Sequence, residues 1–339
     1  MTSADASDLE NRAMTMFGPD FPRLKRACEE LRNWGRWGSD DEIGTLNFIT
    51  PAHIKRASKL VRSGRVISLA MDLSQFGPQV GVSGRFNPMH YMIRDGQDAL
   101  LSQISVIPAG FGSADDIFMM PTQGATHWDA LSHVFWEGKM WNGYAAQLVS
   151  SSGAARNGIE NVRERVVGRG VLLDIPRYLG VATLDEGYPI TVADLEGAAA
   201  EARVAIGTGD MILLRTGQLA EFRQANSWHG YAYGSAPGFA FETAFWLARN
   251  NIAAVATDTA SAEAKPSEVM WLREVIPAGP LPWHRVVIAN MGLLVGEMFD
   301  LDRLAEACAE ENKYEFLFIA PSLPLVGAVG SPVNPIAIF

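Results

Sequence analysis

The chain has 339 residues, of which 48% are hydrophobic, and a formal net charge of −10 at pH 7. This length and composition suit a globular protein with a sizeable apolar core. The negative charge, and the lack of any basic cluster interleaved with aromatic residues, argue against nucleic acid and anionic membrane surfaces as partners.

The cysteines and the N-terminal sequence indicate the compartment. Cys28 and Cys308 are the only two thiols and lie far apart, which is more typical of a reducing cytosol than of a disulfide scaffold. The first residues lack a basic and apolar signal peptide, and no apolar run approaches the length of a membrane helix. We therefore expect a cytoplasmic protein.

The first part of the chain is predicted to hold a polar arm, two helices and a strand. Residues 1–15 are polar and acidic, and we expect a frayed arm there. Helices are predicted over residues 21–34, where leucines and aromatics recur at helical spacing, and over 52–62, after a threonine N-cap and a proline. Alternating side chains predict a strand over residues 66–73.

Two stretches that contain glycine and aromatic residues are candidate lids. Residues 76–100 are predicted to be a long irregular segment holding His90, and residues 228–241 form the second stretch. A long loop in a compact domain is often a binding loop, although a simple surface excursion has the same sequence pattern.

The second half of the chain alternates between predicted strands and helices. Strands are predicted at residues 171–175, 210–215, 252–257, 285–289 and 316–320. Helices are predicted at residues 191–203, 242–249 and 301–311. This alternation indicates a mixed α/β fold. The sequence contains no internal repeat, low-complexity tract or clear linker, so we expect a single domain.

One short stretch, residues 123–133, gathers two of the six histidines and one carboxylate. On an extended segment, His127 and Asp129 point to the same face, because side chains alternate with a period of two. Trp128 then points to the other face, where an apolar layer could hold the strand rigid. A small turn after Leu131 would bring the imidazole of His133 back over the pair.

This stretch predicts a metal site. Neutral imidazole and carboxylate are typical ligands of Zn and Mn, and a further imidazole left free is suited to proton transfer. The simpler alternative is that His127 and Asp129 form a hydrogen bond at a strand end. Spacing alone does not decide between them, because His-x-Asp-x-x-x-His is far less specific than the helical His-Glu-x-x-His.

The stretch also resembles a known family. Thr126-His127-x-Asp129-x-x-x-His133 is similar to the centre of the His-x-Gly-Thr-His-x-Asp-x-Pro-x-His motif of the cyclase-like metal hydrolases, which include bacterial kynurenine formamidase and isatin hydrolase. The likeness runs from about residue 33 to the C-terminus and is closest to a longer-chain cyclase branch. Further similar segments are residues 33–38, 41–47, 258–259, 282–284, 314–318 and 330–335.

The resemblance implies a fold and an assembly. It implies one cyclase-like domain over residues 16–339, with a β/β/α arrangement around a barrel-like core, and a homodimer or homotetramer. Two positions depart from the motif. Gln123 stands where the short formamidases carry the first histidine, and Leu131 replaces the proline.

The resemblance also extends the candidate site. Glu297 ends the apolar run over residues 292–297, where a carboxylate is either exposed at a strand end or paired inside. In the family a carboxylate or amide at this place completes the metal shell, which makes Glu297 the third expected ligand. His284 corresponds to a ligand of a second metal in the short formamidases. Because Gln123 is a poor ligand, we expect one ion, with His284 as a substrate contact.

Other side chains are assigned to substrate or left open. The amide of Gln123 is expected to hold the reacting water or the substrate carbonyl. Trp128 is a candidate for the wall of an aromatic-tolerant pocket. Asp258 and Glu263 follow an apolar strand, where polar groups either face a crevice or cap a helix.

These observations predict a metal-dependent hydrolase of a small-molecule amide, cyclic amide or lactone. His127, Asp129 and Glu297 are expected to hold one divalent Mn or Zn ion, and His133 is expected to transfer the proton. Two alternatives remain: a metal-assisted cyclase or lyase that uses the same site, and a metal-stabilised binding protein without catalysis.

Overall fold

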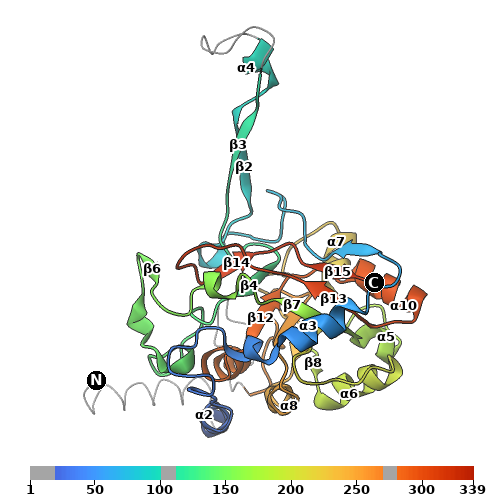
Figure 1. Cartoon of the computed structure of the whole chain (residues 1–339). Coiled ribbons are helices and arrows are strands. Elements are labelled where there is room, and N and C mark those ends of the chain that lie inside the picture. Colours follow the sequence, from blue (N-terminus) through green and yellow to red (C-terminus); the bar gives the residue numbers. More distant parts are fainter. Residues whose placement is uncertain (1–19, 101–111, 270–280) are drawn as a thin grey trace.

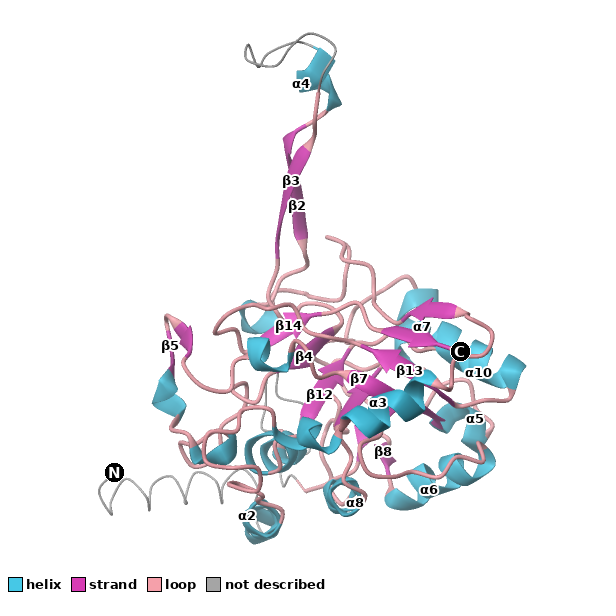
Figure 2. Ribbon diagram, viewed as in Figure 1, coloured by secondary structure: helices cyan, strands magenta, loops and turns pink. Residues whose placement is uncertain are grey.

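A computed structural model describes residues 20–100, 112–269 and 281–339; the predicted arm over residues 1–15 lies outside them. One mixed sheet forms the centre, with helices packed around it (Figures 1 and 2). Its strands, in spatial order, are β1 (Val66–Ser68), β15 (Ile336–Ile338), β13 (Glu315–Ile319), β7 (Val167–Asp174), β9 (Met211–Arg215), β11 (Ala254–Thr257), β12 (Leu294–Glu297), β4 (His127–Asp129) and β14 (Gly330–Pro332). The sheet curls like part of a barrel, which confirms the expected fold class.

The centre of the sheet is parallel and buried on both faces. Strands β7, β9, β11 and β12 run parallel, and antiparallel strands complete both sides. Side chains alternate between two cores: Val171 and Leu173 pack into one, and Leu172 packs into the other. Because both faces are covered, these strands read as nearly continuous apolar runs in the sequence.

Helices cover both faces. Leu24, Leu195 and Leu247 join the first core, and Leu304 joins the second. The α-helices of the described ranges are α2 (Phe21–Glu30), α3 (Pro51–Ser58), α4 (Gly96–Leu100), α5 (Ile175–Leu179), α6 (Val192–Glu201), α7 (Gln218–Gln224), α8 (Thr243–Arg249), α9 (Pro282–His284) and α10 (Asp302–Glu311). None of these helices has the length and apolar character needed to cross a bilayer.

Short elements complete the fold. The small strand pairs are β2 (Met89–Arg94) with β3 (Asp115–Met119), β5 (Val149–Ser150) with β6 (Gly153–Ala154), and β8 (Pro189–Ile190) with β10 (Gly238–Phe239). The 3₁₀ turns are η2 (Gly44–Phe48), η3 (Val82–Gly84), η4 (Trp141–Gly143), η5 (Ala146–Leu148) and η6 (Ile159–Val162).

The segment predicted to be irregular over residues 76–100 is partly a strand. Its second half contains β2, which pairs with β3 to form a hairpin that projects away from the body of the molecule (Figure 1). The prediction missed this strand because its partner lies beyond the segment, at residues 115–119, so the segment by itself carries no hairpin signal.

The strand predicted over residues 285–289 is wrong. The chain there forms a wide helical turn, η7 (Arg285–Asn290), directly after α9. Its β-branched residues Val286, Val287 and Ile288 favour a strand locally, but all three are fully buried in the first core. Pro282 starts the preceding helix, and packing keeps the chain helical through this turn.

The remaining differences concern boundaries. The helix predicted over residues 21–34 ends at Glu30, and the helix predicted over 52–62 ends at Ser58. The strand predicted over 66–73 ends at Ser68. Thr191 caps helix α6 as expected, and its hydroxyl and backbone amide exchange hydrogen bonds with Asp194.

Candidate metal centre

Strand β4 lies between β12 and β14, and this pairing positions the site. His127 lies directly opposite Glu297, and Trp128 lies opposite Gly296. Directly opposed residues share a face of the sheet, so Glu297 joins His127 and Asp129 on one face. The extended conformation expected for this stretch is confirmed, and Glu297 is buried rather than exposed at a strand end.

Trp128 holds β4 from the opposite face. Its indole is fully buried, donates from Nε1 to the Ala320 carbonyl at 2.9 Å and packs edge-on against Phe299. It lies over Gly296, where a Cβ would come within 2.6 Å of the indole ring. The structure therefore corrects the prediction that Trp128 contacts the substrate: this side chain belongs to the core behind the site.

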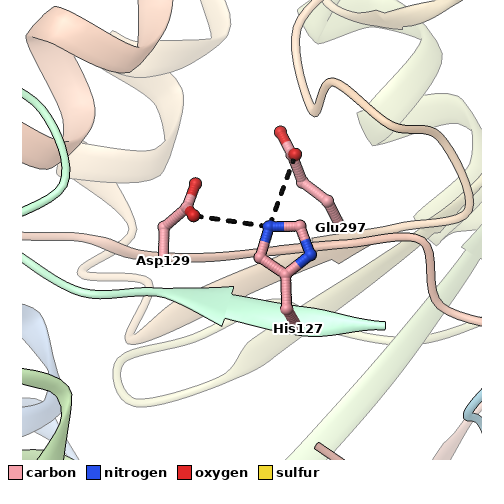
Figure 3. A group of neighbouring side chains, drawn as sticks. All are labelled: His127, Asp129 and Glu297. Carbon is pink, nitrogen blue, oxygen red and sulfur yellow. Dashed lines mark ion pairs between the residues drawn. The ribbon is translucent and has the colours of Figure 1, made fainter. Parts of the chain in front are cut away.

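The side chains of His127, Asp129 and Glu297 converge (Figure 3). His127 Nε2 lies 3.3 Å from Asp129 Oδ1 and 3.7 Å from Glu297 Oε2. One possible ligand atom from each residue lies within 4.8 Å of the others, and all three residues are buried. In the part of the chain that the structure describes, this is the one group of histidine, cysteine and acidic side chains with such geometry.

The tautomer of His127 is set by the backbone. Its Nδ1 contacts the Ala125 carbonyl oxygen at 2.8 Å, and a carbonyl only accepts, so Nδ1 carries the proton. In the neutral ring with this tautomer, the Nε2 lone pair points at the two carboxylates. Such a hydrogen bond from the second nitrogen is what orients a metal-ligating histidine.

Two buried atoms of this cluster lack a hydrogen-bond partner. They are His127 Nε2 and Asp129 Oδ1. Burial raises the pKa of Asp129, but His133 and His127 outweigh this effect and hold the pKa below its ordinary value, so the carboxyl is ionised. A lone pair facing a buried carboxylate is unfavourable without a cation between them. The donor set therefore fits a divalent ion such as Zn or Mn.

Glu297 is held so that one carboxylate oxygen stays available. Its Oε1 accepts from the backbone amide of Ala262 at 2.9 Å and lies 3.1 Å from His284 Nε2, while Oε2 faces His127. The next residue, Met298, has a left-handed backbone with φ of 59°. Its carbonyl accepts from the Thr126 hydroxyl at 2.5 Å, which fixes this strained turn against the core side of β4.

His284 lies between two carboxylates. Its Nδ1 is 2.7 Å from Glu263 Oε1, and its Nε2 contacts Glu297. Burial lowers the pKa of His284, but the hydrogen bonds to Glu263 and Glu297 outweigh it and raise the pKa to about 10. Both ring nitrogens are thus engaged, and the residue is 2% exposed. The expected substrate contact does not fit this burial: His284 instead contacts and orients the candidate ligand Glu297.

Glu263 is the residue that sequence reasoning left without a role. Besides His284 Nδ1, it accepts from the backbone amides of Trp283 at 3.2 Å and His284 at 3.1 Å, which caps α9. Asp258, its companion in the sequence, instead accepts from the backbone amides of Thr216 and Gly217, both at 2.8 Å. It fastens a turn outside the cluster. The sequence could not distinguish the role of Glu263 from that of Asp258. The position of Glu263, two residues after Ser261, is too weak a signal to predict its contact with His284.

His133 returns to the cluster through a turn, as expected. Its backbone amide donates to the Ala130 carbonyl at 2.9 Å, and its Nε2 lies 3.7 Å from Asp129 Oδ1. The side chain is 26% exposed, whereas that of His127 is 0% exposed. Burial lowers the pKa of His133, an effect that Asp129 opposes and Arg85 reinforces. The imidazole is therefore neutral at pH 7 and able to accept a proton.

Gln123 lies on the far side of His133. Its Nε2 is 3.4 Å from His133 Nδ1 and donates to the Val329 carbonyl at 3.2 Å, and its Oε1 accepts from Thr122. The amide therefore contacts the candidate base, and its expected contact with the reacting water or the substrate carbonyl stays a prediction. The amide positions His133 against the end of the sheet.

Comparisons with known proteins identify the family and the fold of the chain. The family model described as putative cyclase matches residues 67–264. A crystal structure described as a novel cyclase is 36% identical over 92% of this chain and 99% of that chain, with a TM-score of 0.81. Isatin hydrolase A from Labrenzia aggregata, bound to benzyl benzoate, is 18% identical over 83% of this chain and 94% of its own, with a TM-score of 0.56.

The fold and the histidine–carboxylate cluster place the chain among proteins of the cyclase fold. It belongs to the putative cyclase family, which confirms the resemblance of its central motif. Isatin hydrolase A from Ralstonia solanacearum is also similar, at 18% identity over 80% of this chain and 91% of its own, with a TM-score of 0.55. At this identity the likeness shows a shared fold. A comparison with curated protein sequences finds no match.

Proposed function

We propose that the protein is a metal-dependent hydrolase of an amide, a cyclic amide or a lactone. The observation that carries the proposal is the pair of buried atoms without hydrogen-bond partners, His127 Nε2 and Asp129 Oδ1, beside Glu297 Oε2. These three residues would hold one divalent ion, Zn or Mn. When bound, such an ion polarises a substrate carbonyl and lowers the pKa of water from 15.7 to about 7.

His133 has the position and protonation for acid–base work beside this cluster. Its Nε2 faces the ligand atoms, and its exposed fraction is the largest among the three clustered imidazoles. The neutral ring takes a proton at Nε2 and returns it to the departing nitrogen or oxygen. A positioned general base of this kind typically contributes about 10²–10⁴ in rate.

The surrounding residues keep this arrangement rigid. Glu263 and His284 hold Glu297, Ala125 fixes the tautomer of His127, and Gln123 contacts His133 from behind. A site whose groups are fixed before the substrate arrives loses little free energy to reorganisation during the reaction.

Metal analysis combined with turnover tests the proposal. The purified protein is expected to hold one ion per chain, and a chelator should abolish turnover of a panel of N-formyl anilines, isatin-type cyclic amides and unsaturated lactones. Adding Mn or Zn should restore turnover, and product formed in H₂¹⁸O should contain one ¹⁸O atom. Products without ¹⁸O would favour the cyclase or lyase alternative. Undiminished metal in the His127→Ala/Asp129→Ala double variant would overturn the site.

Three further expectations are proposed with this function. They are a small-molecule substrate, a cytoplasmic location and a homodimer or homotetramer. Sedimentation equilibrium of the purified chain would measure the assembly, and a monomer at micromolar concentration would contradict it.

A further inference from the structure

The pairing of β4 with β12 stops at two of the expected metal ligands. Along this antiparallel pair, His127 faces Glu297. In the same register Thr126 would face Met298, but the pairing ends one residue earlier, and the Met298 backbone turns into the left-handed region with φ of 59°. The two strands therefore separate directly beside the cluster, at a place where regular sheet hydrogen bonds no longer fix their spacing.

A side chain takes over where the backbone pairing ends. The hydroxyl of Thr126 donates to the Met298 carbonyl at 2.5 Å and accepts from the backbone amide of Met71 at 2.8 Å. Thr126 is 1% exposed, so these bonds form away from water. A hydroxyl can donate and accept at once, whereas a valine side chain of the same shape can do neither. The buried hydroxyl thus satisfies one main-chain carbonyl and one main-chain amide.

The Met298 turn is also held from its other side. The Met298 amide donates to the Thr259 carbonyl at 2.9 Å, and the next amide, of Phe299, donates to the Thr257 carbonyl at 2.9 Å. The Met298 side chain is fully buried in a small cluster that includes Tyr231. A left-handed backbone is unfavourable for a residue that carries a Cβ, so contacts such as these are needed to hold it.

This turn controls where Glu297 lies. The residue directly precedes Met298, so a change in the backbone angles of the turn would tilt the end of β12 and the carboxylate with it. One carboxylate oxygen, Oε1, accepts from the Ala262 amide at 2.9 Å, and the other, Oε2, lies 3.7 Å from His127 Nε2. The bond from Thr126 to Met298 therefore ties the strand end that carries one expected ligand to the strand that carries the other two.

We propose that Thr126 is a positioning residue of the metal centre, whose hydroxyl holds the left-handed Met298 turn so that Glu297 stays opposite His127. The inference rests on the proposed metal site and adds to it a residue on the core side of β4. Without the hydroxyl, the turn relaxes in the metal-free protein. Part of the free energy of ion binding is then used to restore the turn, and the affinity for the ion falls.

The test measures the affinity of the full chain for Zn and for Mn by competition with a chelating dye. Thr126→Val should weaken binding of both ions about 10–100-fold, and Thr126→Ser, which keeps the hydroxyl, should stay within about threefold of the wild type. Thr45→Val is the matched control. The Thr45 hydroxyl is also buried and donates to a main-chain carbonyl, that of Ala253 at 2.8 Å, but at the amino end of β11.

The control separates positioning from stability. Both valine variants should unfold at a lower temperature than the wild type, because each leaves a buried carbonyl without its hydroxyl partner. Thr45→Val should nevertheless keep the wild-type metal affinity within about twofold, since a loss of stability far from the ligands does not loosen Glu297.

A second pair of variants decides the question even if Thr126→Val does not fold. Met298→Gly and Met298→Ala both remove the packed side chain, but only glycine adopts the left-handed backbone without strain. Met298→Gly should therefore bind Zn and Mn about fivefold more tightly than Met298→Ala.

Three results would contradict the positioning role. They are wild-type metal affinity in Thr126→Val, an equal loss of affinity in Thr45→Val, and equal affinities in the two Met298 variants. A wild type that binds neither ion would instead contradict the proposed metal site itself, so the two failures are distinguishable.

Discussion

Two antiparallel strand pairs of this molecule carry a histidine close to a carboxylate. One of these histidines is exposed to solvent and the other is buried. In the β2–β3 hairpin, His90 Nε2 lies 2.8 Å from Asp116 Oδ2, and the two side chains are 58% and 62% exposed. In the β4–β12 pair, His127 Nε2 is farther from its carboxylates, at 3.3 and 3.7 Å, and its side chain is 0% exposed.

The shorter contact is the one whose two partners need no further ligand. His90 and Asp116 satisfy one another and water satisfies the rest, so the pair needs no further ligand. His127 has already committed its Nδ1 to the backbone, and its Nε2 faces carboxylates at a distance that leaves room for an ion. A buried atom without a partner therefore identifies a site better than a short histidine–carboxylate distance does.

The largest expected effect comes from replacing the base. His133→Ala should lower kcat by about 10²–10⁴ and leave the metal in place, because its role is proton transfer. His90→Ala on the hairpin removes the other histidine paired with an aspartate and should leave kcat unchanged. Turnover and elemental analysis of both variants measure this. Loss of the ion together with activity in His133→Ala would make His133 a ligand.

The two strand pairs should also differ strongly in how much the truncation of an aromatic side chain destabilises the protein. Trp128→Ala should lower the free energy of unfolding by about 3–5 kcal/mol, because it leaves a cavity over Gly296. Phe118→Ala should change it by less than about 0.5 kcal/mol, because Phe118 on β3 is 56% exposed. Denaturant unfolding of both variants gives the comparison. Equal costs would mean that the core side of β4 does not hold the site.

A smaller effect is expected from replacing Glu263, which contacts His284 and is not itself a candidate metal ligand. Glu263→Gln keeps the shape of the side chain but removes the charge that holds His284, so metal affinity should fall about 10–100-fold. The matched hairpin change, Asp116→Asn, should not alter metal affinity. Competition with a chelating dye measures both constants. Unchanged affinity in Glu263→Gln would show that Glu297 is held well enough by Ala262 alone.

The last prediction is that the two buried cysteine thiols do not react in the native protein. Burial raises the pKa of the Cys28 thiol to about 12 and also raises the pKa of the Cys308 thiol. At pH 8 only about one Cys28 in ten thousand is then a thiolate, the form that reacts. The native protein should consume no disulfide reagent within minutes. Ile117→Cys adds an exposed hairpin thiol that should react fully. Rapid reaction of the wild type would mean that the core opens easily.

The sequence predicted the site where local periodicity decides geometry. A period of two was enough to place His127 and Asp129 on one face, and the apolar run ending at Glu297 marked a buried strand. The contact of Glu263 with His284 could not be predicted, because it joins a loop to a helix start across 21 residues. Trp128 shows the opposite case. The alternation of side chains along the strand already placed it on the face opposite His127 and Asp129, and in the structure it is buried on that face.

The fold, like the site, was predictable where the local sequence pattern determines the structure. The parallel strands at the centre follow from runs such as Met211–Arg215, which are buried on both faces. The hairpin could not be predicted because its exposed apolar residues do not alternate with polar ones, and the turn η7 could not because packing overrides the β propensity of Val286 and Val287.

The pairing of β4 has a consequence for the order in which the protein is made. Both strands beside it, β12 and β14, come from residues 294–339, whereas β4 itself is complete at Asp129. A ribosome thus synthesises two candidate ligands and then about half of the chain, residues 130–293, before the third candidate ligand and the flanking strands emerge. Contacts of such long sequence separation form late and slowly. Binding of an ion at the proposed centre would accordingly be among the last events of its biogenesis, and a chain truncated before residue 294 carries the central motif without Glu297.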